Sequence, residues 1–166
     1  MELKGFITNL GKYTEGELIG EWITFPVDEE EKEEILKRIG CNCSRYEEYF
    51  FTDYENDLDI SLDLGEYESI DSLNEIAEAV ESWNDEEMAH AVIEAYGIDD
   101  FMNSDEDDYY LLSDVSDDYD LGYYYAVECG CLSIPDDLEP YFDYEAYGRD
   151  ISFNGCFTSY GWVERC

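Results

Sequence analysis

The chain has 166 residues, of which 45 are Asp or Glu, eight are Lys or Arg and one is His, so its formal net charge is −37. A surface of this sign repels the phosphates of nucleic acids and the anionic headgroups of membranes, which excludes both as direct ligands. Hydrophobic residues make up 45% of the chain and aromatic residues 16%, so the composition predicts a folded core rather than a disordered polymer.

The N-terminal part of the chain is predicted to contain strands and one helix. Three β-prone runs predict strands at residues 4–10, 19–25 and 49–53. The loop-forming residues 11–16 separate the first two strands. A helix is predicted before the third strand, with Asp28 as its N-cap and Gly40 as its end.

The middle of the chain is predicted to be helical. Apolar residues recur there with the period of an amphipathic helix, at Leu73, Ile76, Ala77, Val80 and Trp83. Residues 84–87 form a capping-box pattern that opens a second helix, and Gly97 suits the end of that helix. We expect the two helices to form a hairpin that leans on neighbouring elements, because a pair this small cannot bury enough apolar surface alone.

The C-terminal part again mixes helices and strands. A strand is predicted at residues 109–112 and a helix at residues 117–129. Pro135 suits a first helical position, so a further helix is predicted from there to about Tyr147. Residues 151–163 predict a terminal hairpin that turns near Gly161.

Together these elements predict an α+β fold built from three small modules with a strongly acidic surface. The modules are residues 1–62 (mixed α/β), 63–103 (helical) and 104–166 (mixed α/β). The chain shows no basic start followed by an apolar run of the signal-peptide kind. No apolar stretch approaches the roughly 20 residues that cross a bilayer. We therefore expect a cytoplasmic protein without a membrane span.

The charges are distributed unevenly along the chain. No Lys or Arg occurs from Tyr46 to Gly148, a stretch of 103 residues that contains 33 Asp or Glu. Lys and Arg placed between acids would reduce the repulsion among the carboxylates, but this stretch contains neither. The pattern therefore indicates selection for something other than folding. Arg149, the first cation after the stretch, is expected to form an internal ion pair.

Motifs for catalysis or metal binding are weak. The single histidine, His90, lies in the stretch without basic residues, so a packing or surface role is favoured over a nucleophilic triad. The cysteine pairs at 41/43 and 129/131 enclose one residue, whereas structural zinc sites usually enclose about two to four. Free thiols are favoured over zinc ligands for all six cysteines. A calcium loop starting at Asp117 fails, because it places Tyr119 and Leu121 at ligand positions.

The density of acids is the strongest feature of the sequence. A solvated face explains most charge runs, but solubility needs a net charge of only about 2 to 8 in a small domain. The alternative is that the carboxylates stand in for phosphates. Duplex DNA carries one charge per about 1.7 Å of axis, so 37 charges correspond to roughly 63 Å of duplex. A symmetric dimer would correspond to roughly twice that length.

Five blocks of the sequence match, in the same order, blocks of a known protein family. They are Leu10-Gly-Lys-Tyr-Thr-Glu-Gly-Glu-Leu18, Gly20-Glu-Trp-Ile-Thr-Phe-Pro26, Tyr46-Glu-Glu-Tyr49, Asp53-Tyr-Glu55, and Leu138-Glu-Pro-Tyr-Phe-Asp-Tyr-Glu-Ala-Tyr-Gly-Arg-Asp150. This series resembles the ArdA antirestriction protein family, and the resemblance covers most of the chain. The predicted middle helices match that family in character rather than in sequence.

The resemblance implies an elongated fold of three modules and a homodimer joined through the C-terminal module. It also implies mimicry of bent B-form DNA. The implied target is a type I restriction–modification enzyme, whose methyltransferase core holds the DNA-binding groove. Such proteins travel on conjugative plasmids and transposons and protect incoming DNA in a new host. The family needs no cofactor and catalyses nothing, so none is expected here.

Under this interpretation, acids from all modules occupy the phosphate positions of the groove, and each contributes little alone. The candidate phosphate-mimicking residues are Asp71, Glu75, Glu78, Glu81, Glu86, Glu87, Asp105, Asp107, Asp108, Asp114, Asp117 and Asp118. The candidate dimer interface lies in residues 151–163 and comprises Ile151, Phe153, Phe157 and Trp162.

Two other functions stay open from the residues alone. One is a decoy for another DNA-binding protein, such as a nucleoid protein or a CRISPR effector. The other is a salt-adapted or cation-buffering protein with no specific partner. The charge pattern by itself does not separate these from a restriction inhibitor, whereas the family resemblance favours the inhibitor.

Overall fold

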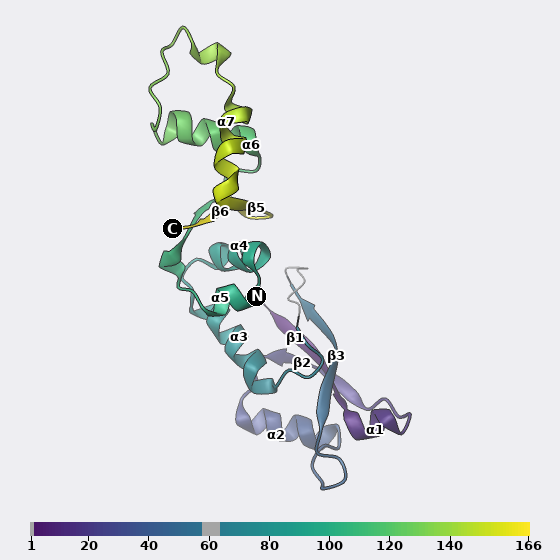
Figure 1. Ribbon diagram of the computed structural model, residues 1–166. Coiled ribbons are helices and arrows are strands. Elements are labelled where there is room, and N and C mark those ends of the chain that lie inside the picture. The colour runs from purple at the N-terminus through teal and green to yellow at the C-terminus, as the bar shows by residue number, and fades with distance from the viewer. Residues whose placement is uncertain (1, 58–63) are drawn as a thin grey trace. The chain divides into compact units, whose positions relative to one another are not determined.

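The computed structural model describes residues 2–57 and 64–166 and has a mixed α+β fold with two small antiparallel sheets (Figure 1). The chain divides into two compact units, residues 1–84 (unit 1) and residues 85–166 (unit 2). The predicted module boundary at residue 62 lies outside the described residues, so the three-module division stays a prediction. None of the helices in the described ranges is long and apolar enough to cross a membrane.

Unit 1 is built on a sheet with the strand order β2–β1–β3. Its strands are β1 (Leu3–Asn9), β2 (Gly20–Phe25) and β3 (Tyr49–Asn56), which confirms the three predicted strands. β1 is central and pairs antiparallel with both neighbours, with a register shift between Phe6 and Ile7 on the β3 side. Ile7 and Phe51 are fully buried, so the sheet contributes directly to the core of the unit.

The segment between β1 and β2 corrects the sequence prediction. Residues 11–16 were expected to be a loop, but Leu10–Thr14 form a short helix, α1. The side chain of Asn9 caps α1, because its oxygen accepts a hydrogen bond from the backbone N–H of Lys12 at 2.9 Å. Residues with loop propensity therefore form a helical turn because a cap begins it.

Two helices complete unit 1, and both confirm the predictions. In α2 (Glu29–Arg38) the carboxylate of Asp28 accepts from the N–H of Glu31 at 2.8 Å, and Gly40 follows the helix with φ +80°. In α3 (Ile70–Ser82) the predicted apolar stripe is buried as far as Val80, while Trp83 lies just beyond the helix end. The side-chain amide of Asn74 bonds both backbone groups of Val27 at 2.8 Å, which ties α3 to the end of β2.

Unit 2 begins with α4 (Glu86–Tyr96) and α5 (Ile98–Met102). The predicted helix is confirmed, but its cap is Asp85 rather than Asn84, because the Asp85 carboxylate accepts from the N–H of Met88. Gly97 ends α4 with φ +86°, as expected. Because α3 and α4 belong to different units, their packing as a hairpin stays a prediction.

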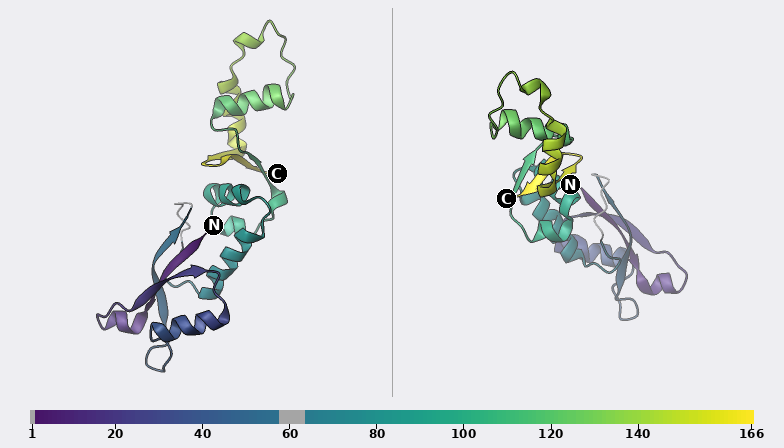
Figure 2. Two further views of the ribbon diagram at one scale, coloured as in Figure 1. Left: turned by 180° about the vertical axis from the view of Figure 1, so that it is seen from behind. Right: turned by 45° about the horizontal axis from the view of Figure 1, so that its top comes forward.

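The second sheet has the order β4–β6–β5 and lies between α4 on one face and the helices α6 and α7 on the other (Figures 1 and 2). Its strands are β4 (Tyr109–Leu112), β5 (Gly155–Thr158) and β6 (Gly161–Arg165), preceded by the short helices η1 (Glu106–Asp108) and η4 (Ser152–Asn154). The predicted strand at 109–112 and the hairpin turning near Gly161 are both confirmed. Trp162 is fully buried at the centre of this unit's core.

The two remaining helices of unit 2 agree only in part with the sequence. The predicted helix at 117–129 is α6 (Asp118–Tyr123), which widens into a π-helical turn, η2 (Tyr124–Glu128). The prediction of a helix that starts at Pro135 is wrong. After a loop containing the short helix η3 (Glu139–Tyr141), the helix α7 spans Tyr144–Ile151 and is capped by Asp143. Pro140 would lie inside the predicted helix, where proline removes a hydrogen bond and clashes with the preceding turn.

Helices α6 and α7 cross at two glycines. A Cβ atom at Gly122 would clash with the carbonyl of Tyr144, and one at Gly148 would clash with the carbonyl of Asp118. The backbones can therefore meet only because both residues lack a side chain. This contact holds α7 over the face of the sheet that carries Trp162.

We expect Gly122→Ala and Gly148→Ala each to lower the free energy of unfolding by about 3 kcal/mol or more, because overpacking against rigid backbone costs about 1–3 kcal/mol even where side chains can move. Urea denaturation followed by circular dichroism measures the change. Gly65→Ala is the matched control, since its Cβ would meet only the Glu68 side chain, at 3.5 Å. A Gly148→Ala protein as stable as the control would contradict the close crossing.

Candidate functional site

The predicted phosphate-mimicking acids are on the surface. Eleven of the twelve are exposed and one, Asp118, is half-buried. Four of them belong to α3, at Asp71, Glu75, Glu78 and Glu81. They lie on the side of α3 opposite its buried apolar stripe, because the two sets of residues are offset around the helix. The amphipathic pattern that packs α3 into unit 1 thus also directs its acids outward.

Some of these acids also have structural partners. Asp71 forms an ion pair with Lys32, and Asp117 caps α6 by accepting from the N–H of Asp120 at 2.9 Å. The Asp108 carboxylate accepts from the backbone N–H of Asp105 at 3.0 Å. Such acids stabilise the fold as well as carrying charge.

Of the eleven exposed candidate acids, six have side chains that make no hydrogen bond or ion pair among the residues that the structure describes. They are Glu75, Glu78, Glu81, Glu87, Asp107 and Asp114. We call them the unpartnered acids. Their carboxylates are hydrated and are available to an external cation.

The cations of unit 1 lie beside acids of the same unit. Arg38 holds Glu21 at 2.6 Å, and Arg45 holds Glu15 at 2.9 Å. Hydrogen bonds from Tyr46 and Arg45 lower the pKa of Glu15, so this carboxylate stays charged in mild acid. The other pairs are Lys4–Glu2, Lys12–Glu17, Lys32–Asp71 and Lys37–Glu33.

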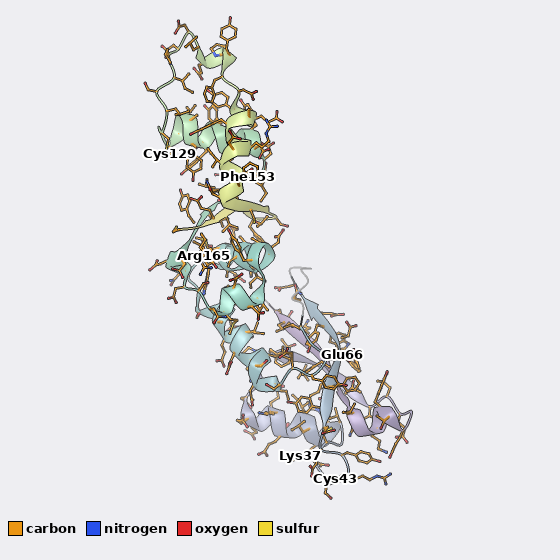
Figure 3. The ribbon with its side chains drawn as sticks, viewed as in Figure 1. Lys37, Cys43, Glu66, Cys129, Phe153 and Arg165 are labelled. Carbon is orange, nitrogen blue, oxygen red and sulfur yellow. The ribbon has the colours of Figure 1, made fainter. Side chains whose placement is uncertain are left out.

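Unit 2 has almost no such compensation. It contains 22 acidic and two basic residues, a net charge of −20. Arg165 lies 3.9 Å from Asp100 and over the ring of Tyr109 (labelled in Figure 3). Arg149 is exposed and, within the described ranges, forms no ion pair, so the expected internal pair is wrong.

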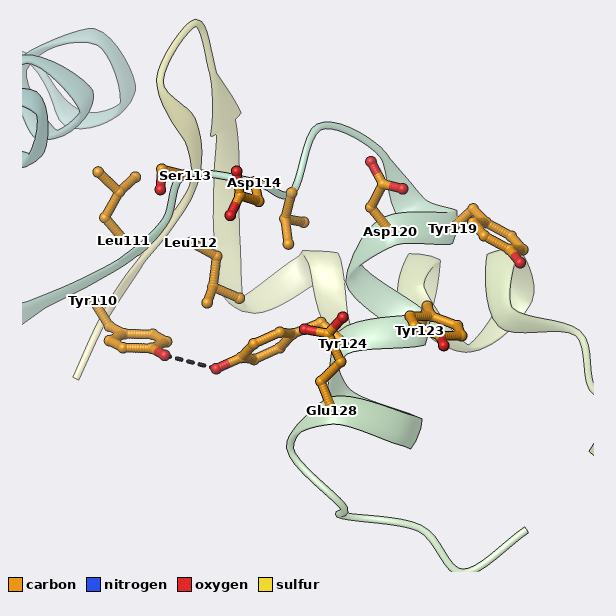
Figure 4. Close-up of a pocket in the computed structure, with 11 residues that line it drawn as sticks. Tyr110, Leu111, Leu112, Ser113, Asp114, Tyr119, Asp120, Tyr123, Tyr124 and Glu128 are labelled. Atoms are coloured by element: carbon orange, nitrogen blue, oxygen red, sulfur yellow. Dashed lines mark hydrogen bonds between the residues drawn. The ribbon is translucent and has the colours of Figure 1, made fainter. Parts of the chain in front are cut away.

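A hollow of about 340 Å³ opens in unit 2 between β4 and α6 (Figure 4). Its lining combines tyrosine rings with the carboxylates of Asp114, Asp120 and Glu128. The phenols of Tyr110 and Tyr124 are 2.7 Å apart, and their hydrogen bond raises the pKa of Tyr124 to about 12. The phenol of Tyr124 therefore stays neutral near pH 7, and the formal charge of the hollow comes from its three carboxylates.

The chemistry of this hollow suits a cation. Carboxylates attract an ammonium or guanidinium group, and tyrosine faces add a cation–π contribution. Of the residues that line the hollow, the sequence-based candidates include Asp114 but not Asp120, Glu128 or the tyrosines. The run of tyrosines at 123–125 was the available signal, but nothing in the sequence placed it beside β4.

His90 and the cysteines do not form a metal site in the described part of the chain. His90 is buried in α4 and packs against Tyr160, which confirms a packing role. All six cysteines are free thiols.

The predicted dimer residues differ in accessibility. Phe153 is 84% exposed and Phe157 is 38% exposed, whereas Ile151 is half-buried against the core of unit 2. Trp162 is fully buried in that core, so it cannot contact a partner.

A second apolar surface was not anticipated from the sequence. It lies on the loop between η2 and α7, where Leu132, Leu138 and Tyr141 line a hollow of about 440 Å³.

We expect added sodium chloride to raise the melting temperature. The ion pairs of unit 1 are on the surface and worth only about 0–1 kcal/mol each, so screening them costs little. Screening the self-repulsion of a net charge of −37 gains more. Circular dichroism at low salt and at about 0.5 M salt measures the shift, with a neutral solute of equal osmolality as control. A lower melting temperature in salt would mean that attraction outweighs repulsion.

Comparison with known proteins gives one family. Residues 6–164 match the family model described as antirestriction protein (ArdA), which is nearly the whole chain. None of the curated proteins compared with the chain matches it.

Proposed function

Because the chain belongs to the ArdA antirestriction protein family, we propose that it inhibits type I restriction–modification enzymes by mimicking bent B-form DNA. Membership of the family implies an antirestriction function. The observation that supports mimicry is the set of exposed carboxylates without cationic partners, which no structural need of the chain explains.

The proposed mechanism is replacement of phosphates by carboxylates. The groove of an enzyme that holds DNA presents Lys and Arg side chains to the phosphates of the duplex. The unpartnered acids would bind those cations and release the counterions that occupied them, as DNA does. No catalytic step follows, so the protein acts as an inhibitor that needs no cofactor.

The hollow in unit 2 gives this binding a local feature. A basic side chain of the target could enter between Tyr110 and Tyr123 and meet the carboxylates of Asp114 and Glu128. The rings would hold the aliphatic stem, and the carboxylates would bind the charged end. Such a contact would depend on the orientation of the target. It would add to the long-range electrostatic attraction that the many acids exert together.

We propose further that the protein acts in the cytoplasm as a homodimer and travels with mobile DNA, as the family does. A dimer would present its acids over twice the length of one chain. Phe153 and Phe157 are exposed on one segment of unit 2, which supports a seam there. By occupying the DNA-binding groove of the methyltransferase core, the dimer would protect incoming plasmid or transposon DNA.

Phage plating tests the proposed function directly. Unmodified phage should form plaques more efficiently on a type I restricting strain that expresses this chain than on the same strain without it. An isogenic strain that lacks the restriction system is the control and should show no difference. Equal plating on the restricting strain, with the chain present as folded protein, would contradict the proposal.

A pull-down separates the inhibitor from the two alternatives. The purified chain should capture the type I enzyme at low salt and release it as salt rises. A salt-adapted protein would capture nothing, and a decoy for another DNA-binding protein would capture that protein instead.

We expect inhibition to depend on the unpartnered acids together. An exposed charge pair contributes about 0–1 kcal/mol, so changing one acid to its amide should weaken inhibition by no more than about fivefold. Changing all six unpartnered acids should abolish it. Competition with DNA for the purified type I enzyme measures both effects.

A matched variant loses the same number of charges elsewhere. It carries amides at six ion-paired acids of unit 1, namely Glu2, Glu15, Glu17, Glu29, Glu33 and Glu34. This variant should retain most of its inhibition, because those charges are already offset by cations. Equal loss in both variants would show that net charge alone matters and that the unpartnered acids have no special role.

We expect Phe153→Ser or Phe157→Ser to convert the dimer to a monomer, because each removes an exposed apolar side chain from the proposed seam. Analytical ultracentrifugation measures the change. Tyr67→Ser is the matched control, since Tyr67 is 73% exposed in unit 1. Unchanged dimerisation would remove the seam from this segment, and a monomer produced only by Leu138→Ser would place it on the loop instead.

A further inference from the structure

The backbone holds Cys129 and Cys131 in a tight turn at the end of η2. The N–H of Cys129 donates to the carbonyl of Tyr124 at 2.7 Å, and the N–H of Cys131 donates to the carbonyl of Tyr125 at 3.1 Å. Gly130 between them has φ +68°, a conformation that glycine adopts without strain. Both cysteines are therefore fixed by the last turn of the helix while the chain reverses between them.

This turn brings the two thiols into contact. The Cys131 thiol donates to the sulfur of Cys129, and the two Sγ atoms are 3.4 Å apart. Both residues are exposed, and Figure 3 labels Cys129 at the start of the loop that leads to α7. A disulfide bond is about 2.05 Å long, so only a small side-chain movement separates the thiols from a bond.

The other cysteine pair has the same spacing and a different geometry. Cys41 is buried, and its thiol donates to the carbonyl of Glu48 at 3.3 Å rather than to Cys43. Burial raises the pKa of the Cys41 thiol, which keeps it protonated and unreactive. The chain thus contains an internal control, because the spacing of the cysteines is identical while the burial and hydrogen bonding of the two pairs differ.

We propose that Cys129 and Cys131 form a reversible oxidation site that low-molecular-weight disulfides convert to an intrachain disulfide. The thiolate of Cys129 attacks one sulfur of the oxidant, forming a mixed disulfide and releasing one thiolate. The thiolate of Cys131 then attacks Cys129, forming the Cys129–Cys131 bond and releasing the second thiolate. The two cysteine protons go to the two released thiolates, so the protein loses two electrons and the oxidant gains them.

The order of attack follows from the hydrogen bond. Because Cys131 donates to Cys129, its proton is held and its pKa is raised. Cys129, whose sulfur accepts this hydrogen bond, attacks first, and Cys131 resolves the mixed disulfide. A group with a raised pKa gains its thiolate only as pH rises, so closure should speed up between pH 7 and pH 9.

The test uses the purified full chain and oxidised glutathione, with free thiols alkylated at timed intervals and disulfides located by peptide mass mapping. We expect closure of the 129/131 pair, seen as loss of two hydrogen atoms, to be at least about tenfold faster than any reaction at Cys41. Gly130→Ala should slow closure by about fivefold, because alanine is strained at a positive φ. Its Cβ would meet nothing within 4 Å, so the fold is retained.

Three outcomes would overturn the proposal. They are equal rates at the two pairs, disulfides only between separate chains, and glutathione adducts on Cys129 that never resolve. Cys131→Ser should stop at the glutathione adduct, and closure of any other bond at Cys129 in that variant would also count against it. The readout is a covalent change in the protein alone, so it stands or falls independently of restriction inhibition.

Discussion

Mutual repulsion among carboxylates is the constraint under which this chain folds. In unit 1 the cations offset part of that repulsion, since each lies next to an acid of the same unit. Unit 2 has a net charge of −20 and cannot rely on ion pairs. Its stability has to come from apolar packing around Trp162 and from hydrogen bonds that its acids accept. The division of cations between the units therefore decides which interactions hold each one together.

Backbone N–H groups are the hydrogen-bond partners of several acids in unit 2. Asp85, Asp117 and Asp143 each cap a helix by accepting a backbone hydrogen bond. The N-terminus of a helix carries partial positive charge, so a carboxylate there is stabilised without a Lys or Arg. Glu94 is held in a comparable way by the N–H of Ser159 in the β5–β6 turn. Acids in these positions add negative charge and stability together.

The sequence predicts elements well where a local rule decides them. The strand at 109–112, the cap at Asp28 and the stripe of α3 follow from alternation, capping and helical period, and all are present. The helix expected from Pro135 fails because a favourable first position was weighed above the later Pro140. A residue that favours the start of a helix, such as Pro135, is not sufficient when a proline follows within the next turns.

In the candidate site, too, local sequence rules predict some features, whereas others depend on tertiary packing. Exposure of the acids is predictable, because a carboxylate without a cation stays in water. The sequence does not predict which acids have partners. Asp71, for example, pairs with Lys32, a residue of another helix that lies 39 positions earlier in the chain. The tyrosine hollow and the contrast between the two cysteine pairs likewise depend on which segments the fold brings together.

The crossing of α6 and α7 has a consequence for how such a chain can diverge. If the surface acts through summed charge, as we propose, individual acids can be exchanged, lost or moved as long as the total persists. Gly122 and Gly148 have no such freedom, because the carbonyl opposite each leaves no room for even a methyl group. Over long lineages the acids should drift while these two glycines stay, so the uncharged pair would identify a distant relative after its charge pattern has become unrecognisable.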